Sequence, residues 1–489
     1  MLPIDWNKFF DQFVYHEGTP MLFNTGFFLW LFMLFISGFY VLRNKKDPRK
    51  LYVILFSLYF YYKSSGIYFL LLIASTIIDY NLANFIYNAD TQWRKKAWLV
   101  FSLVLNLGLL GYFKYTNFLY EIFCNAINHP FDPFSIFLPV GVSFFTFQSL
   151  SYTIEIYRGD MKPVDRIIDY AFFVSFFPQL VAGPIVRAKD FLPQVSKPAF
   201  VTREMLGQAV YLIIAGLFKK VVISDYISAN FVDRIFENPT LYTGLENLFG
   251  VYGYALQIYC DFSGYSDMAI GIALLFGYRL TLNFDSPYQS SSITEFWRRW
   301  HISLSTWLRD YLYISLGGNR KGRARTYVNQ FLTMLLGGLW HGAAFRFVIW
   351  GALHGVALGI DKFIKEFVRI PDSKLVRIGG ILLTFHFVCF CWIFFRAADM
   401  HVAGDVISQI AFHFTPSIFF DFIAGYKNIL MVMMVGYFLH FIPKHIEQKA
   451  QGIVMDLPLS AKVAMMVSII VLVIQVKSAN VQPFIYFQF

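Results

Sequence analysis

The chain has 489 residues, of which 57% are apolar, 20% aromatic and only 15% charged. Soluble domains average about 25% charged residues, so this composition excludes an ordinary soluble protein and indicates an integral membrane protein. The formal net charge of +10 is gathered in short loops. In a membrane protein, basic loops indicate the orientation in the membrane and need no binding partner to explain them. We therefore expect this chain to be surrounded by membrane lipid and not to bind nucleic acid.

Apolar runs long enough to cross a bilayer, which takes roughly 20 residues, occur throughout the chain. They are too numerous to be signal peptides, and the first ten residues lack the basic start of a cleavable leader, so none is expected. Two shorter runs, 51–62 and 67–80, are separated by KSSG and predict a helical hairpin. The longer runs cover residues 22–42, 97–113, 378–395 and 461–476.

Clusters of Lys and Arg predict which loops face the cytoplasm. The first segment instead contains Asp5, Asp11 and Glu17, so we expect an extracytoplasmic N-terminus. The basic stretch 444–449 then directs the last apolar run outward, which predicts an extracytoplasmic C-terminus in a cell (inner) membrane. The other basic clusters cover residues 43–50, 94–96, 219–220, 320–325 and 362–377.

The middle of the chain, residues 138–350, mixes Gly, Pro and polar residues with aromatics. Irregular backbone survives at membrane depth only where protein or a water-filled cavity satisfies its polar groups. We therefore expect short, tilted or re-entrant helices around a polar cavity. The predicted organisation is all-α, with N-terminal transmembrane helices in 1–135, a core in 136–400 and C-terminal transmembrane helices in 401–489.

Two histidines in apolar surroundings are candidates for chemistry, because ionisable residues are costly there. His341, in LLGGLWHGAAF, is flanked by small residues that allow another helix or a ligand to approach closely. His301 lies in TEFWRRWHISLSTWLRDYLY, which reads as an amphipathic helix with Thr294 as its N-cap. Taken alone, each of these histidines is better explained as a hydrogen-bonded structural residue, and so are His354 and His386.

Other chemical signals are weak. Asp261, Asp267 and Asp285 are expected to pair with Arg or to cap helices. Walker, HExxH, GxSxG and Rossmann glycine patterns do not occur, which removes the usual support for ATP-driven transport and zinc hydrolysis. We expect no metal, because the four cysteines lack metal-ligand spacing. These cysteines are Cys124, Cys260, Cys389 and Cys391.

Several motifs together resemble the membrane-bound O-acyltransferase (MBOAT) family, in particular its bacterial branch of alginate O-acetyltransferases and teichoic-acid D-alanyl transferases. They are SFFTFQSLSYTIEIYRG, FFPQLVAGPIVR, YCDFSGYSDMAIG, FWRRWHISLSTWLRDYLYISLGGNR and GGLWHG. The resemblance implies a ring of helices around a two-sided funnel, with 136–400 as the catalytic core. It also makes His341 the catalytic histidine and His301 the second motif position.

The resemblance implies that a cytoplasmic acyl thioester meets a hydroxyl from outside, with a histidine accepting the hydroxyl proton. No cofactor is expected, and acetyl-coenzyme A is the implied co-substrate. A charged carrier protein that donates D-alanine or another acyl group is the alternative. A basic cytoplasmic mouth is expected to attract either donor, although positive-inside topology explains each cation as well. The candidate donor-binding residues are Arg298, Arg299, Lys219, Lys220 and Arg320.

The chain ends on PFIYFQF, whose last six residues, 484–489, resemble the C-terminal FxYxxF motif of a small protein that accompanies the D-alanyl transferase. The resemblance makes Tyr486 a candidate acyl relay, anchored by burial of Phe484, Phe487 and Phe489. It implies an extracytoplasmic SGNH-type acyltransferase as partner and an exopolysaccharide as final acceptor. Two alternatives stay open: a tail that only plugs an apolar crevice, and a transporter or flippase of an acylated lipid or saccharide.

Overall fold

The computed structural model describes residues 5–369, 371–476 and 484 of the chain. These residues form helices and connecting loops, and no β-strand occurs among them. The all-α prediction is therefore confirmed. The chain divides into two compact units, Met1–Ala209 with Met268–Thr281, and Val210–Asp267 with Leu282–Phe489. This division follows packing and is drawn differently from the three regions expected along the sequence, which stay a prediction.

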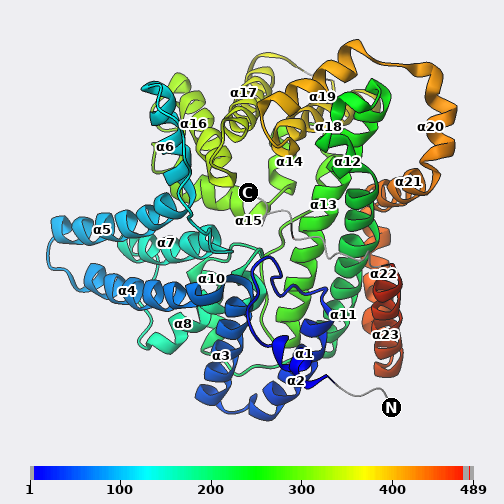
Figure 1. Ribbon diagram of the computed structural model, residues 1–489. Coiled ribbons are helices and arrows are strands. Elements are labelled where there is room, and N and C mark those ends of the chain that lie inside the picture. Colours follow the sequence, from blue (N-terminus) through cyan, green and yellow to red (C-terminus); the bar gives the residue numbers. More distant parts are fainter. Residues whose placement is uncertain (1–4, 370, 477–483, 485–489) are drawn as a thin grey trace. The chain divides into compact units, whose positions relative to one another are not determined.

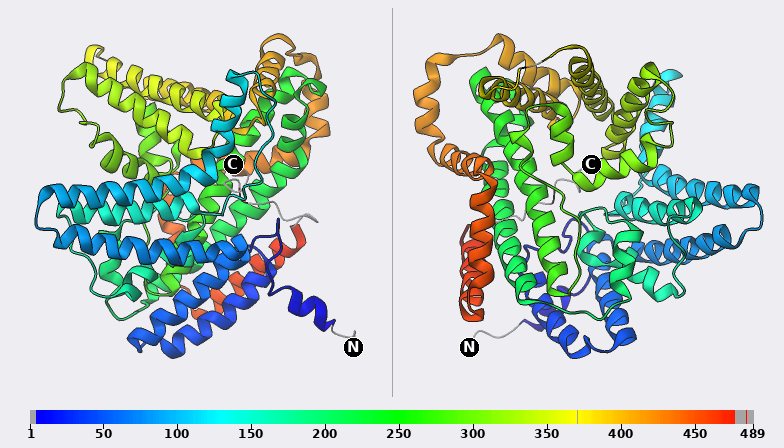
Figure 2. Two further views of the ribbon diagram at one scale, coloured as in Figure 1. Left: turned by 60° about the vertical axis from the view of Figure 1, so that its left-hand side comes forward. Right: turned by 180° about the vertical axis from the view of Figure 1, so that it is seen from behind.

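The first unit holds the N-terminal helices (Figure 1). Within it, three of them, α4, α5 and α7, pack on one another (Figures 1 and 2). Its helices are α1 (Trp6–Asp11), α2 (Gly26–Leu42), α3 (Lys46–Ser65), α4 (Phe69–Asn88), α5 (Gln92–Leu110), α6 (Thr116–Ala126), α7 (Val142–Arg158), α8 (Ile167–Ser175), α9 (Phe177–Leu180) and α10 (Ala188–Val195).

Aromatic side chains form the core of the first unit. The fully buried ring of Phe177 contacts eight other phenylalanines, with ring centroids 5.0 to 6.4 Å away. Each such ring buries a large apolar area, and tilted and edge-to-face pairs add about 0.5–1.5 kcal/mol beyond that area. Buried charge is compensated here as well, since the ammonium of Lys50 bonds the carboxylate of Asp169.

The second unit contains the long helix α13, whose last residues belong to the first unit. Its elements are most of α11 (Arg203–Leu217), the π-helices η3 (Phe218–Asp225), η4 (Ser228–Val232) and η7 (Leu308–Tyr313), and α12 (Asp233–Glu237), α13 (Gly244–Leu275), α14 (Ile293–Arg299), α15 (Ile302–Trp307), α16 (Arg323–His341), α17 (Phe345–Phe367), α18 (Lys374–Arg396), α19 (Met400–Phe412), α20 (Phe419–Gly425), α21 (Lys427–Phe441), α22 (Lys444–Asp456) and α23 (Leu459–Val476).

Five helical stretches of the described chain are long and apolar enough to cross a membrane, or seven if two bent helix pairs each count as a span. The bent pairs are α19 with α20, at 87°, and α21 with α22, at 93°. These numbers confirm a multi-pass membrane protein. The five stretches are Lys46–Asn88, Gln92–Ala126, Arg203–Glu237, Phe345–Phe367 and Lys374–Arg396.

Two of the predicted membrane spans and the predicted hairpin differ from the structure. The runs 22–42 and 461–476 are helical, as α2 and α23, but both count among the shorter apolar helices. The predicted helical hairpin at KSSG is wrong, because both of its apolar runs belong to one candidate span of 43 residues, Lys46–Asn88. Within it α3 ends at Ser65, and Gly66, with φ of +59°, starts a short 3₁₀ turn before α4. Glycine tolerates this left-handed backbone without strain, so the break falls where the sequence predicts it.

Helices α16 and α17 approach closely because glycines line their contact (Figures 1 and 2). A Cβ atom on Gly351 would lie 2.6 Å from the carbonyl oxygen of Met334. One on Gly338 would lie 3.0 Å from the Cα of Gly351 and would overlap the carbonyl oxygen of Phe347. Small residues are what allow backbones to approach in membrane helix pairs. The prediction that small residues around His341 admit a second helix is confirmed.

Replacing Gly338 with Ala is expected to separate α16 from α17, because the added methyl group meets backbone that cannot yield. Overpacking of this kind costs about 1–3 kcal/mol. The measurement is the thermal unfolding midpoint of the purified protein in detergent. Gly404→Ala on α19 is the matched control, since nothing lies within 4 Å of its added Cβ. A midpoint equally unchanged in both variants contradicts this account of the helix contact.

Candidate active site

His341 is the last residue of α16, and its ring is enclosed by aromatic side chains. The ring centroid lies 5.1 Å from that of Trp350 on α17 and 5.3 Å from that of Phe395 on α18, both in edge-on arrangements. The neighbouring Trp340 ring lies at 5.0 Å. After His341 the backbone turns extended at Gly342, where a Cβ atom would overlap the ring of Phe347. His341 therefore ends α16, and the close approach of α17 brings Trp350 against its ring.

His301 lies at a break between two short helices. The sequence predicted one amphipathic helix starting at Thr294, and this prediction is wrong in two respects. The N-cap of α14 is Ser292, whose hydroxyl accepts a hydrogen bond from the amide of Glu295 at 3.3 Å. The helix also stops at Arg299, and α15 begins only after His301, which adopts a left-handed backbone with φ of +43°. This conformation is uncommon outside glycine and needs support from its surroundings.

Asn283 supplies that support. Its backbone carbonyl accepts a hydrogen bond from the amide of Ile302 at 2.9 Å, and its side-chain Oδ1 accepts bonds from the amide and hydroxyl of Ser303 at 3.3 and 2.9 Å. Its Nδ2 donates to the hydroxyl of Ser266 at 3.1 Å. The side chain of Asn283 is fully buried. These bonds hold the chain on both sides of His301 against the loop that precedes α14.

The same network assigns the tautomer of His301. Its Nδ1 lies 3.1 Å from Oδ1 of Asn283. Because the backbone amide of Ser303 can only donate, Oδ1 is an acceptor, and Nδ1 must therefore carry the hydrogen. The other ring nitrogen, Nε2, is then the one able to accept a proton or a hydrogen bond. Burial lowers the pKa of His301 to about 3, so the ring is neutral at physiological pH.

Trp340 lies between the two histidines. Its ring centroid is 6.3 Å from that of His301 and 5.0 Å from that of His341. The structure thus brings together the two histidines that the sequence selected. His341 is 3% exposed and His301 is 0% exposed, so a substrate reaches either ring only when neighbouring groups move.

The C-terminal tail contributes to this cluster through Phe484, which is fully buried as predicted. Its ring centroid lies 5.0 Å from Tyr265 and 5.7 Å from Phe262, one turn apart on α13. Phe262 in turn contacts His301 edge-on at 4.6 Å. A single ring therefore separates the start of the tail from His301. Tyr486, Phe487 and Phe489 lie outside the described residues, so the relay tyrosine itself stays a prediction.

The carboxylates singled out from the sequence are paired, but their partners are lysines, so the predicted pairing with arginine is wrong. Asp267 bonds Lys219 at 2.7 Å, and Asp261 bonds Lys220 at 2.5 Å. Lys220 also bonds Asp225 at 2.8 Å. Asp285 pairs with Lys444 at 2.9 Å. These ion pairs neutralise the charges of Lys219 and Lys220 inside the fold.

The other candidate donor-binding residues have different surroundings. Arg299 pairs with Glu295 at 2.8 Å. Arg298 and Arg320 are exposed. Electrostatic attraction of a phosphorylated donor to any of the five cations stays a prediction. His354, which the sequence left as structural, accepts a hydrogen bond on Nδ1 from the indole of Trp297 at 3.2 Å.

Sequence reasoning missed Asn283, Trp340 and Phe262 as members of the site. Phe262 and Trp340 lie inside the quoted motifs, but their aromatic type matches dozens of other residues in a chain with 57 phenylalanines and 10 tryptophans. Asn283 lies in TLNFDSPY, a stretch without a chemical pattern. No signal in the sequence alone could have linked it to a histidine 18 residues later.

The helical membrane fold and the similarity to known proteins show a membrane enzyme of the O-acyltransferase class. The chain belongs to the membrane-bound O-acyltransferase (MBOAT) family, whose model matches residues 157–400. It is 44% identical over 391 residues to a probable alginate O-acetylase AlgI of Pseudomonas aeruginosa, covering 78% of this chain and 73% of that protein. It is 37% identical over 417 residues to a peptidoglycan O-acetyltransferase of Helicobacter pylori, covering 79% of each. It is 30% identical over 293 residues to a teichoic acid D-alanyltransferase of Bacillus subtilis, covering 56% of this chain and 72% of that protein.

Replacing Asn283 with Asp is expected to keep the Oδ1 acceptor while placing a negative charge beside Nδ1 of His301. A nearby opposite charge favours the protonated imidazole, so the pKa of His301 rises from about 3. The acid limb of the activity–pH profile then moves to higher pH if His301 must be neutral. Acyl transfer measured from pH 5 to 8 tests this shift.

Asn283→Ala is the companion variant. It leaves the buried donors of His301 and Ser303 without their acceptor, which costs about 1–3 kcal/mol of stability for each unsatisfied group. A purely structural Asn283 predicts lower activity in both variants with the same pH profile as the unaltered protein. That outcome contradicts a requirement for neutral His301 in acyl transfer.

Proposed function

We propose that this protein transfers an acetyl group from cytoplasmic acetyl-coenzyme A through the membrane to an extracytoplasmic acceptor that modifies an exopolysaccharide. The observation that carries the proposal is the placement of His341 beside Trp340, which also contacts His301, within a chain of this family. Burial of Phe484, the first residue of the tail motif, against Phe262 and Tyr265 supports the proposal. Localisation in the cell (inner) membrane with both termini outside is part of the proposal.

In the first step the phenol of Tyr486 attacks the thioester carbonyl. The new C–O bond replaces the C–S bond, and His341 takes the phenol proton and returns it to the departing thiolate. A neutral imidazole suits this role, since general-base catalysis contributes about 10²- to 10⁴-fold. The aryl ester is a better acyl donor than an alkyl ester, because a phenol with pKa near 10 is the better leaving group.

In the second step a hydroxyl of an extracytoplasmic SGNH-type acyltransferase attacks the tyrosyl ester. A serine ester forms, the phenol of Tyr486 recovers the proton, and the exopolysaccharide receives the acetyl group later. Only the acyl group passes through the protein. The two histidines are thus assigned to the face where the thioester reacts, with Nε2 of His301 as a second proton or hydrogen-bond acceptor.

Acetyl transfer is favoured over D-alanyl transfer by the extent of the similarity. Relatives named as O-acetylases or O-acetyltransferases align over 78–79% of the chain, against 52–56% for the two named as D-alanyltransferases. A carrier-protein donor is the second candidate. The transporter alternative differs from both, because it predicts movement of substrate without thioester cleavage.

The test supplies purified protein with radiolabelled acetyl-coenzyme A and locates the label by mass spectrometry. We expect label on Tyr486 in the unaltered protein, and a rate of labelling about 10²- to 10⁴-fold lower in His341→Ala because the base is lost. Tyr486→Phe is expected to bind the donor but to transfer nothing. His401→Ala, at a side chain that is 85% exposed, is the matched control and is expected to label normally.

The outcomes separate the parts of the proposal. Labelling that persists in His341→Ala removes that residue from the base role. Normal transfer by Tyr486→Phe removes the relay but leaves the enzyme. Label accepted only from a D-alanyl carrier protein overturns the choice of donor, and substrate movement with an intact thioester in His341→Ala overturns the enzyme reading.

A further inference from the structure

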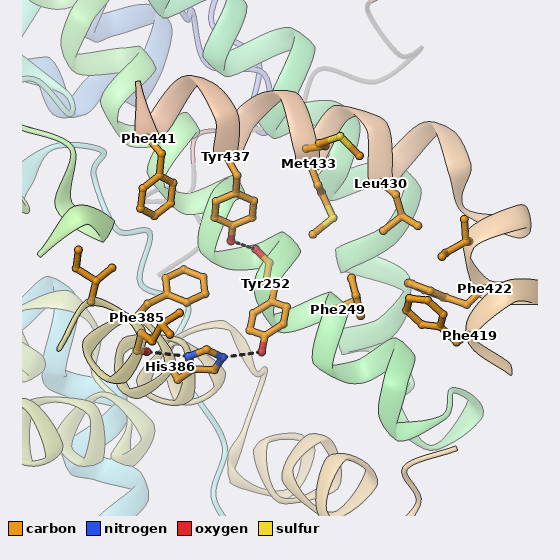
Figure 3. A pocket seen from close by; sticks show the side chains of 14 residues that line it. Phe249, Tyr252, Phe385, His386, Phe419, Phe422, Leu430, Met433, Tyr437 and Phe441 are labelled. Atoms are coloured by element: carbon orange, nitrogen blue, oxygen red, sulfur yellow. Dashed lines mark hydrogen bonds between the residues drawn. The ribbon is translucent and has the colours of Figure 1, made fainter. Parts of the chain in front are cut away.

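An apolar pocket of about 610 Å³ lies in the second unit, and its lining residues are not those of the histidine cluster (Figure 3). Helix α21 forms one wall and α18 the facing wall, while residues of α13 and α20 complete it. Aromatic side chains line most of it, together with the flexible Met433 and Met434. The aromatic residues are Phe249, Tyr252, Phe385, Phe419, Phe422, Tyr437 and Phe441. Pockets of about 300–1,000 Å³ hold ligands of small-molecule size.

The few polar groups of the lining are already satisfied by one another. Nδ1 of His386 donates to the carbonyl oxygen of Leu382 at 2.7 Å, so Nε2 accepts from the hydroxyl of Tyr252 at 3.0 Å. The hydroxyl of Tyr437 donates to the carbonyl oxygen of Tyr252 at 2.8 Å (Figure 3). The pocket therefore offers its occupant no unsatisfied hydrogen-bonding group, which favours a hydrocarbon as the occupant.

Much of the pocket's wall comes from helices of membrane-spanning character. They are the candidate span Lys374–Arg396 and parts of the two bent helix pairs. The pocket's rim is open to the surroundings, with Leu382 55% and Met434 71% exposed. A hollow of this kind in a bilayer is reached directly by lipid chains. Methionine side chains adapt their shape to irregular apolar partners, which suits a flexible chain.

Two observations separate a lipid from a partner helix. Surfaces on which membrane helices pack are enriched in Gly, Ala, Ser and Thr, and none of these types lines the pocket. A cation also stands at one end: Arg377, exposed on the first turn of α18, precedes Ile381 of the lining by four residues and so lies on the same helix face. A positive charge one turn beyond an apolar pocket matches an amphiphile with an anionic headgroup.

We propose that this pocket binds an acyl chain of a membrane phospholipid, with the phosphate of its headgroup at Arg377. The site is separate from the acyl-transfer chemistry and does not depend on the proposed function. Its occupant fills the space between α18 and α21 that the side chains leave open. Lipid bound there joins α18, which carries Phe395 beside His341, to α21.

The test uses the full-length protein in nanodiscs of phosphatidylcholine with a small fraction of phosphatidylglycerol that carries a diazirine in its acyl chain. After irradiation, mass spectrometry maps the adducts. We expect adducts on the α18 and α21 peptides that line the pocket. Leu382→Trp and Met434→Trp, which fill it from exposed positions, are expected to lower labelling about tenfold, the ratio that 1.4 kcal/mol of lost affinity gives.

Leu383→Trp is the matched control, because this neighbouring side chain on α18 is 74% exposed and does not line the pocket. It is expected to leave labelling unchanged. Arg377→Gln is expected to reduce labelling by the phosphatidylglycerol probe but not by a diacylglycerol with the same diazirine chain, which isolates the headgroup contact.

Uniform labelling of the lipid-facing surface that the two filling variants do not change overturns the proposal. Equal loss of both probes in Arg377→Gln overturns the headgroup assignment. Labelling at the pocket after purification that is absent in native membranes indicates a partner helix in the cell and likewise overturns it.

Discussion

Buried polar side chains at two places in the second unit are satisfied by other protein groups, and the first of these places positions His301. At the break between α14 and α15, Oδ1 of Asn283 accepts hydrogen bonds from Ser303 and from Nδ1 of His301. The ammonium of the buried Lys220 is paired with the carboxylates of Asp225 and Asp261. An unpaired amide or charge at these positions costs several kcal/mol, so these bonds hold the side chains in place.

The two histidines are therefore placed by different means. His341 depends on backbone contact, because Gly338 and Gly351 let α16 and α17 approach until its ring meets Trp350. His301 depends on a hydrogen-bonded amide that also selects its tautomer. The ring of Trp340 contacts both imidazoles, so the two histidines belong to one aromatic cluster.

Near-complete burial of both rings bears on how an acyltransferase of this family works. A site closed to water protects an activated ester from hydrolysis, and it also requires movement before a thioester or a hydroxyl can enter. Phe484 packs on Phe262 and Tyr265, and Phe262 contacts the ring of His301. The two-sided funnel implied by the family resemblance stays a prediction.

Composition and motifs alone determined the class of protein: the charge-poor, aromatic-rich chain indicated a multi-pass helical membrane protein, and FWRRWHISLS with GGLWHG selected His301 and His341. Local signals also placed the break at Gly66. The sequence could not show that the helix around His301 is interrupted. Periodicity indicates which residues are apolar, but not that the distant Asn283 accepts hydrogen bonds from the backbone after His301. Nor could it join Asn283 to His301, or Phe484 to Phe262. Those contacts arise only when helices far apart in the chain pack together, so tertiary structure alone decided them.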